Sequence, residues 1–139
     1  MTVVLDTNAI VQMFGVHSPL APLKDAVVGG RLTAAISTGI WLEYEEVIVR
    51  YAGSGMWVRI TRIFDLTHQL HGNIRHVEPS FFFRLIAADP DDDKFADCAI
   101  AASADFVVTH DAHFAVLRGS GHKPQPIAPA EFIPRFLAP

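Results

Sequence analysis

The side chains best suited to chemistry in this chain are carboxylates, and many of them gather between residues 89 and 111. This stretch reads DPDDDKFADCAIAASADFVVTHD, an acidic cluster that leads into an apolar helix and then a short apolar strand ending in a lone aspartate. Carboxylates near a low-dielectric interior repel one another and raise each other's pKa unless a cation joins them. The stretch therefore predicts part of a divalent-metal site.

Two aspartates follow apolar strands that lie far apart in the sequence. Asp6 comes directly after VVL, and Asp111 comes shortly after FVV. In open parallel α/β sheets, ligands bind at the carboxyl edge of the strands. Either aspartate alone could equally be a helix N-cap. Two of them at the same edge favour a binding site.

Glu43 is a further candidate because of its helical phase. An apolar stripe with a period of 3.6 residues should face the core; it comprises Ile40, Tyr44, Val47, Ile48 and Tyr51. At about 100° per residue, Glu43 lies about 80° from the centre of this stripe, whereas Glu45 and Glu46 lie about 120° and 140° away. Glu43 is thus at the boundary, where its carboxylate can either reach a cleft or extend to solvent, and the other two are surface charges.

The acidic cluster itself must be divided between helix capping and ligand binding. Asp93 falls in the first turn of the predicted helix, with Asp97 one turn later on the same face. Capping and the helix dipole, worth up to about 1 kcal/mol per residue, account for Asp91 and Asp92. We expect Asp93 to be a ligand and keep Asp97 as a secondary candidate.

The types of ligand indicate which metal the site would take. Carboxylate oxygens with few histidines or thiols suit Mg²⁺ or Mn²⁺. His110 and His113 bracket Asp111 and either line the rim of the site or bind Mn²⁺. Asn8 and Thr109 could orient the carboxylates or the waters on the metal, or could equally be turn or capping residues.

Composition limits the class of protein. The chain has 139 residues, half of them hydrophobic, and we interpret residues 1–139 as one globular domain. Its single cysteine, Cys98, excludes an intramolecular disulfide and fits a reducing compartment. No apolar run reaches the ~20 residues that span a bilayer. We expect a cytoplasmic protein without membrane contact, and the net charge of −4 argues against broad electrostatic binding of nucleic acid.

The pattern of apolar residues predicts strands alternating with helices. Parallel pairing with right-handed crossovers follows, so we expect a three-layer α/β/α sandwich with a central, mainly parallel sheet. No secondary structure is predicted for residues 79–86. Phe81, Phe82 and Phe83 are interpreted as core in preference to an interface, and residues 119–126 as a surface loop. The predicted strands are 3–5, 32–36, 74–77, 106–109 and a short one near 127, and the predicted helices are 9–14, 19–28, 39–51, 56–70, 92–103 and 129–137.

Taken in order, the segments VVLDTN, LEYEEVI, DPDDDKF, ADFVVTHD and APAEFI resemble the PIN-domain family, and in particular its VapC-like toxins of toxin–antitoxin systems. The resemblance covers nearly the whole chain. It implies an α/β/α fold, divalent-metal-dependent ribonuclease activity and an acidic quartet at Asp6, Glu43, Asp93 and Asp111. It also implies polar support from Asn8 and Thr109. The chain departs from the family pattern at His110 and His113.

The resemblance also implies partners and a mechanism. The quartet would hold one or two Mg²⁺ or Mn²⁺ ions that bind the scissile phosphate and activate a water for in-line attack. The expected partners are an RNA substrate, single-stranded or structured, a cognate antitoxin protein and a second copy of the chain in a homodimer. Arg50, Arg59 and Arg62 are candidates for phosphate contacts or simply solvated helix residues.

Two other functions fit some of these residues. An aspartyl-type phosphatase or phosphotransfer enzyme also places an aspartate after its first strand, but here Asn8 occupies the position where such enzymes need a second acid. A non-catalytic protein-interaction module would use the same acids only as helix caps. A phosphorylated Asp6 would favour the first alternative, and a melting temperature unaffected by metal would favour the second.

Overall fold

Short apolar runs (TVVL, TAAI and FVV) form the three middle strands of a five-stranded parallel sheet in the structure, a computed structural model that describes residues 1–87 and 89–138, and the two edge strands are more polar. The strands lie in the order β3-β2-β1-β4-β5, so β1 is central. Their bounds are β1 Thr2–Leu5, β2 Thr33–Ile36, β3 Ile74–His76, β4 Phe106–Val108 and β5 Gln125–Ile127. The predicted parallel sheet is confirmed.

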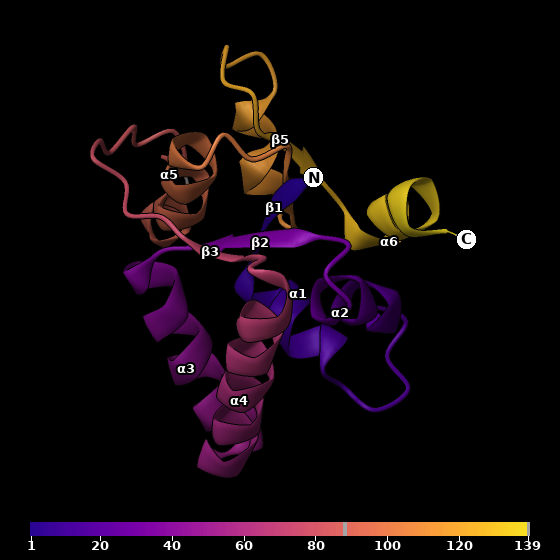
Figure 1. The fold of residues 1–139 in the computed structure, drawn as a ribbon. Helices are drawn as coiled ribbons and strands as arrows, with labels where there is room; N and C mark the ends of the chain where they lie inside the picture. Colours follow the sequence, from indigo (N-terminus) through magenta and orange to yellow (C-terminus); the bar gives the residue numbers. More distant parts are fainter. Residues whose placement is uncertain (88, 139) are drawn as a thin grey trace.

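Helices cover both faces of the sheet and complete the predicted three-layer sandwich. Figure 1 shows α1 to α4 on one side of the sheet and α5 on the other. The helices are α1 Thr7–Met13, α2 Ala21–Val28, α3 Thr38–Ala52, α4 Ser54–His71, α5 Asp93–Ala101 and α6 Pro129–Phe132, with short turns η1 Pro90–Asp92, η2 Ala112–Leu117 and η3 Ile133–Leu137. Among the described residues, no helix is long and apolar enough to cross a membrane.

Local signals in the sequence fix where these helices begin and end. The Asp6 carboxylate accepts a hydrogen bond from the Ala9 amide at 2.9 Å, and the Ser37 hydroxyl accepts one from the Ile40 amide at 3.2 Å. Both are N-caps, at α1 and α3. Gly72 ends α4 with a φ of 65°, a conformation that glycine adopts without the steric cost of a side chain.

The order of the strands creates a crevice beside β1. The chain passes from β1 to β2 and β3 on one side, and then returns to add β4 and β5 on the other. Leu5 of β1 pairs with Val108 of β4, so the residues that follow these two strands emerge side by side. Such a switch point at the carboxyl edge is where doubly wound sheets bind ligands.

Most predicted elements begin and end within two residues of the observed bounds, and three have further differences. Helix 92–103 is preceded by the 3-10 turn η1, and β5 begins at Gln125, within the predicted loop. The predicted helix 129–137 is α-helical only to Phe132 and continues as the π-turn η3, because Pro134 has no amide hydrogen to continue the α-helical ladder. The turn η2 was not predicted.

Candidate metal centre

Carboxylates from distant parts of the sequence line one hollow at the carboxyl edge of the sheet. We call it the acidic hollow; its volume is about 320 Å³. Its lining includes five carboxylate residues, which are Asp6, Glu43, Asp89, Asp92 and Asp111. Three of the four predicted site acids are therefore brought together, and two acids that were not predicted as ligands join them.

Asp6 and Asp111 are tied together by a threonine at the end of β4. The Thr109 hydroxyl donates a hydrogen bond to Asp6 Oδ2 and accepts one from the Asp111 amide at 2.9 Å. With Ala9 donating to Oδ1, both oxygens of the buried Asp6 have a partner. Burial raises the pKa of Asp6, although these hydrogen bonds oppose the rise. Asp6 is thus both a helix cap and part of the hollow, and the contact predicted for Thr109 is present.

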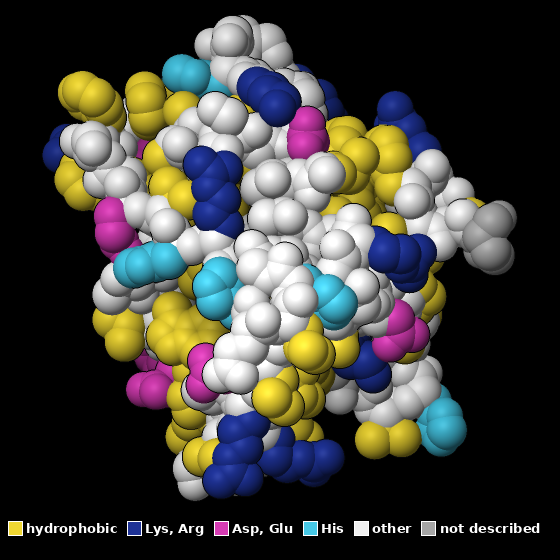
Figure 2. All heavy atoms as spheres, in the orientation of Figure 1, with side chains coloured by type: hydrophobic (Ala, Val, Ile, Leu, Met, Phe, Trp, Pro, Cys, Tyr) yellow, Lys and Arg dark blue, Asp and Glu magenta, His cyan; other side chains and the backbone are white. Residues whose placement is uncertain are grey.

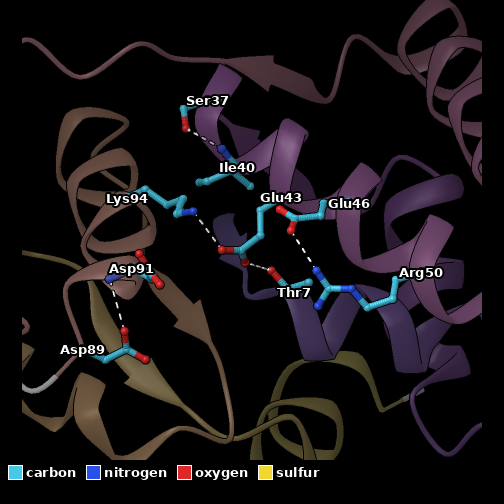
Figure 3. Close-up of polar contacts among 9 residues, drawn as sticks. All are labelled: Thr7, Ser37, Ile40, Glu43, Glu46, Arg50, Asp89, Asp91 and Lys94. Carbon is cyan, nitrogen blue, oxygen red and sulfur yellow. Dashed lines mark hydrogen bonds and ion pairs between the residues drawn. The ribbon is translucent and has the colours of Figure 1, made fainter.

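Glu43 enters the hollow from α3 and is held from both sides. The Thr7 hydroxyl donates to Glu43 Oε2, and Lys94 Nζ lies 2.8 Å from Oε1. Figure 3 shows the Glu43 carboxylate between these two side chains. One residue further along α3, the buried Tyr44 hydroxyl donates to the Leu5 carbonyl and ties the helix to the end of β1. The boundary position predicted for Glu43 is confirmed, and neither Thr7 nor Lys94 was predicted.

Three of the carboxylates that line the hollow lie close to one another and to His113. One atom each from Asp89, Asp92, Asp111 and His113 lies within 4.8 Å of the others. The Asp111 carboxylate accepts from the His113 amide at 2.8 Å, and this bond is the main reason that the pKa of Asp111 is lowered. His113 thus lies beside the last aspartate, and both His113 and His110 are exposed and outside the lining of the acidic hollow.

Asp92 is the least compensated of these carboxylates. Its Oδ2 atom is buried and has no hydrogen-bond partner among the described residues. Burial, and then the nearby carboxylates of Asp111 and Asp89, raise the pKa of Asp92 to about 7. A buried oxygen without a partner, surrounded by other carboxylates, is a position that a divalent cation would stabilise. The residues therefore fit a hard cation with oxygen ligands.

The structure does not bring Asp93 to the acidic hollow. Its carboxylate accepts a hydrogen bond from the Ile86 amide at 2.8 Å, and its neighbour one turn later, Asp97, accepts from the Phe83 amide at 3.0 Å. The phase differs from the prediction because η1 ends at Asp92 and α5 begins at Asp93, so consecutive side chains point to different sides of the chain. Asp93 and Asp97 instead hold residues 83–86.

Capping at this turn is also distributed differently from the prediction. The Asp89 carboxylate accepts from the Asp91 amide at 3.2 Å, as Figure 3 shows. Asp92 occupies the N-cap position of α5, and Asp91 and Asp92 lie in the first turn of η1 as predicted, but among the described residues neither side chain accepts a backbone hydrogen bond there. The sequence signal for Asp89 as the capping residue is the proline that follows it, because proline is common as the first residue of a helical turn, directly after the cap.

The rim of the acidic hollow carries polar and aromatic side chains. Asn8 is exposed and lines it, and so does Arg50, which also pairs with Glu46 at 2.8 Å on an exposed face of α3. Tyr51 was predicted to face the core, but its side chain is 74% exposed at this rim because the buried stripe of α3 ends at Ile48. Arg59 and Arg62 are exposed on α4 and do not line the hollow.

Comparison with known proteins gives one match to a family and one informative structure. A family model described as PIN domain matches residues 2–113. A chain in the crystal structure of VapBC2 from Rickettsia felis, bound to a DNA fragment from their promoter, has a similar fold with a TM-score of 0.59 and 16% sequence identity. The match covers 91% of this chain and 99% of that one. No curated protein sequence matches the chain.

Proposed function

The chain belongs to the PIN-domain family, whose members are generally nucleases, and from this premise we propose that it is a divalent-metal-dependent endoribonuclease. The observation that carries the proposal is the acidic hollow at the switch point between β1 and β4. The reaction is hydrolysis of a phosphodiester bond in RNA, with water as the nucleophile. No covalent enzyme intermediate is needed, so no side chain has to act as a nucleophile.

Mg²⁺ or Mn²⁺ is the proposed cofactor. The buried, unpartnered Asp92 Oδ2 and the nearby oxygens of Asp89 and Asp111 support binding of a hard cation, and His113 would suit Mn²⁺. Asp6 and Glu43 line the same hollow and complete the proposed set. A bound ion would neutralise charge on the phosphate and lower the pKa of the attacking water.

The protein's own groups have separate tasks in this proposal. Thr109 fixes the relative positions of Asp6 and Asp111 through its two hydrogen bonds. Lys94, held by Glu43 at the edge of the hollow, supplies a positive charge to a phosphate oxygen. Asn8 can contact the substrate or orient water from the rim. The predicted role of Asp93 as a metal ligand stays a prediction. In the structure its carboxylate accepts a hydrogen bond from the Ile86 amide.

Metal-dependent cleavage of single-stranded RNA is the direct test. We expect Asp6→Asn and Asp111→Asn each to lower the rate by at least about a hundredfold, because electrostatic stabilisation of this kind contributes that much or more. Asp91→Asn is the matched control, since Asp91 is exposed and does not line the hollow. Circular dichroism verifies folding. Full activity in both variants, or in excess EDTA, would overturn the proposal.

We also propose that the chain is the toxin of a toxin–antitoxin pair and forms a homodimer in the cytoplasm. Support comes from the shared fold with a chain of VapBC2 from Rickettsia felis. The expected partner is a small antitoxin encoded next to this chain. Expression of the chain alone should arrest growth of a bacterial host, and co-expression of the neighbouring gene should restore it and yield a co-purifying complex. Normal growth with active enzyme present would exclude the toxin role.

A further inference from the structure

The segment between β3 and η1 presents aromatic side chains to solvent. Phe81, Phe82 and Phe83 are 72%, 75% and 39% exposed, so the place in the core that we preferred for them is wrong. The segment is nevertheless anchored, because the Phe83 and Ile86 amides donate to Asp97 and Asp93 and the Ile86 side chain is buried. Between these anchors Arg84 has a φ of 52°, a left-handed conformation uncommon for a residue with a side chain. The chain is therefore fixed to α5 from the residue that follows Phe82.

This segment forms one wall of a second hollow, which we call the loop hollow. Its volume is about 430 Å³, within the range of small-ligand pockets. Phe82 and Arg84 line it from the segment, Asp97 and Lys94 from α5, and Gly39 from the start of α3. Phe81 does not line it. In Figure 2 hydrophobic side chains gather at the upper left, over the loop that Figure 1 shows beside α5.

Lys94 connects the loop hollow with the acidic hollow. It lines the loop hollow and also pairs with Glu43, which lines the acidic hollow. Figure 3 shows the Lys94 side chain reaching from α5 towards Glu43 on α3. A phosphate bound at Lys94 would therefore have a potential metal centre on one side and an aromatic side chain on the other.

The charges of the loop hollow indicate which part of a nucleotide it would accept. Its carboxylates include Asp97, which is only 3% exposed and, within the described part of the chain, accepts a hydrogen bond through Oδ1 alone. Burial raises the pKa of Asp97, so a donor from a ligand would compensate its charge. Carboxylates repel a phosphate, but they accept hydrogen bonds from the exocyclic amino group of a base such as cytosine.

We propose that the loop hollow binds an unpaired nucleobase with an exocyclic amino group, stacked on Phe82 and next to the phosphate that Lys94 contacts. The inference rests on the proposed ribonuclease function and adds a binding site for one base of the RNA. A paired base would not stack on Phe82, because both of its faces are already stacked on neighbouring bases in a duplex. Phenylalanine suits this role since every base has a face that stacks on an aromatic ring.

Binding of short fluorescein-labelled oligoribonucleotides, measured by anisotropy with Ca²⁺ in place of Mg²⁺ to slow cleavage, tests the inference. Phe82→Ala should weaken binding of oligocytidine about tenfold, the loss typical of one stacking partner. Phe81→Ala is the matched control, with a similarly exposed ring outside the loop hollow, and should change binding less than about twofold. Annealing oligocytidine to oligoguanosine should remove the effect of Phe82→Ala. Equal losses in both variants, or none in Phe82→Ala, would overturn the inference.

A second variant, at Asp97, tests the preference for a base with an amino group. Wild-type protein should bind oligocytidine several-fold more tightly than oligouridine, which carries an oxygen in place of the amino group. Asp97→Asn keeps an oxygen for the Phe83 amide but adds an amide donor, so it should remove or reverse this preference. Unchanged melting temperature checks that the variant folds. Equal binding of both oligonucleotides by the wild type would contradict the proposed base preference.

These outcomes are separate from failure of the proposed function. If the wild type cleaves RNA and Phe82→Ala has unchanged KM and affinity, only the nucleobase site is wrong. If oligocytidine binding depends on Phe82 but no metal supports cleavage, the ribonuclease assignment fails and the binding site stands. If both phenylalanine variants instead turn a dimer into a monomer in analytical ultracentrifugation, without loss of RNA affinity, the surface is a protein contact and the inference is overturned.

Discussion

The two hollows show how neighbouring carboxylates acquire different roles. Asp92 faces the acidic hollow with a buried oxygen that has no partner, and Asp93, the next residue, faces the loop hollow and accepts the Ile86 amide. A backbone amide compensates the charge of Asp93 within the protein. Asp92 instead lies beside Asp111 and Asp89, whose carboxylates raise its pKa and do not compensate its charge. Under the proposed function, Asp92 therefore serves the chemistry, and Asp93 serves to hold residues 83–86.

Substitution of the two neighbours should separate these roles most clearly. We expect Asp92→Asn to lower metal-dependent RNA cleavage by about a hundredfold or more, since it removes a charge from the proposed metal site. Asp93→Asn should leave activity within about tenfold, because an amide oxygen can still accept from Ile86. Initial rates at saturating Mg²⁺ measure both. A larger loss of activity in Asp93→Asn than in Asp92→Asn would show that Asp93 is the metal ligand, as predicted from the sequence.

Metal binding should stabilise the protein through the acidic hollow alone. At a free Mn²⁺ concentration about a hundred times Kd, we expect the melting temperature to rise by roughly 5–10 °C. Differential scanning fluorimetry measures the shift. It should be much smaller in Asp92→Asn and unchanged in Asp97→Asn, whose carboxylate lies in the loop hollow. If Asp97→Asn abolished the shift and Asp92→Asn kept it, the metal would bind in the loop hollow and not in the acidic hollow.

The threonine between the strand ends should matter for activity more than for folding. Thr109→Val keeps the shape of the side chain but removes the hydroxyl that joins Asp6 to the Asp111 amide. We expect cleavage to fall about tenfold, as is usual when a group that orients metal ligands is lost. Thr109→Ser retains the hydroxyl and is the control. Equal rates for the valine variant and the wild type would show that the strand ends need no such link.

The smallest expected effect is the dependence of stability on pH without metal. An unfolded aspartate loses its proton near pH 4, but folded Asp92 keeps it to about pH 7. The folded state therefore binds more protons across this interval, and the contribution of Asp92 to stability declines as pH rises from about 4 to 7. Asp92→Asn should lessen this decline. Urea unfolding in EDTA measures it, and identical pH profiles would show that Asp92 is already compensated in the metal-free protein.

Much of the fold and part of the site could be predicted without the structure. The parallel α/β/α architecture followed from alternating strand and helix patterns, and Asp6 and Asp111 from their places directly after apolar strands. The helical phase of Glu43 predicted its boundary position. These predictions succeed because each depends on local periodicity and on the general rule that parallel strands end at the same edge.

Tertiary contacts decided which of Asp92 and Asp93 lines the acidic hollow. They also decided that Phe82 is exposed. The sequence by itself determined the fold class, the acidic edge of the sheet and the chemistry that its carboxylates favour. The tertiary structure decided which carboxylates meet amides and which meet one another, because the 3-10 turn before α5 changes the helical phase and the Ile86 amide comes from a separate segment. Partners that are far apart in sequence leave no periodic signal along it.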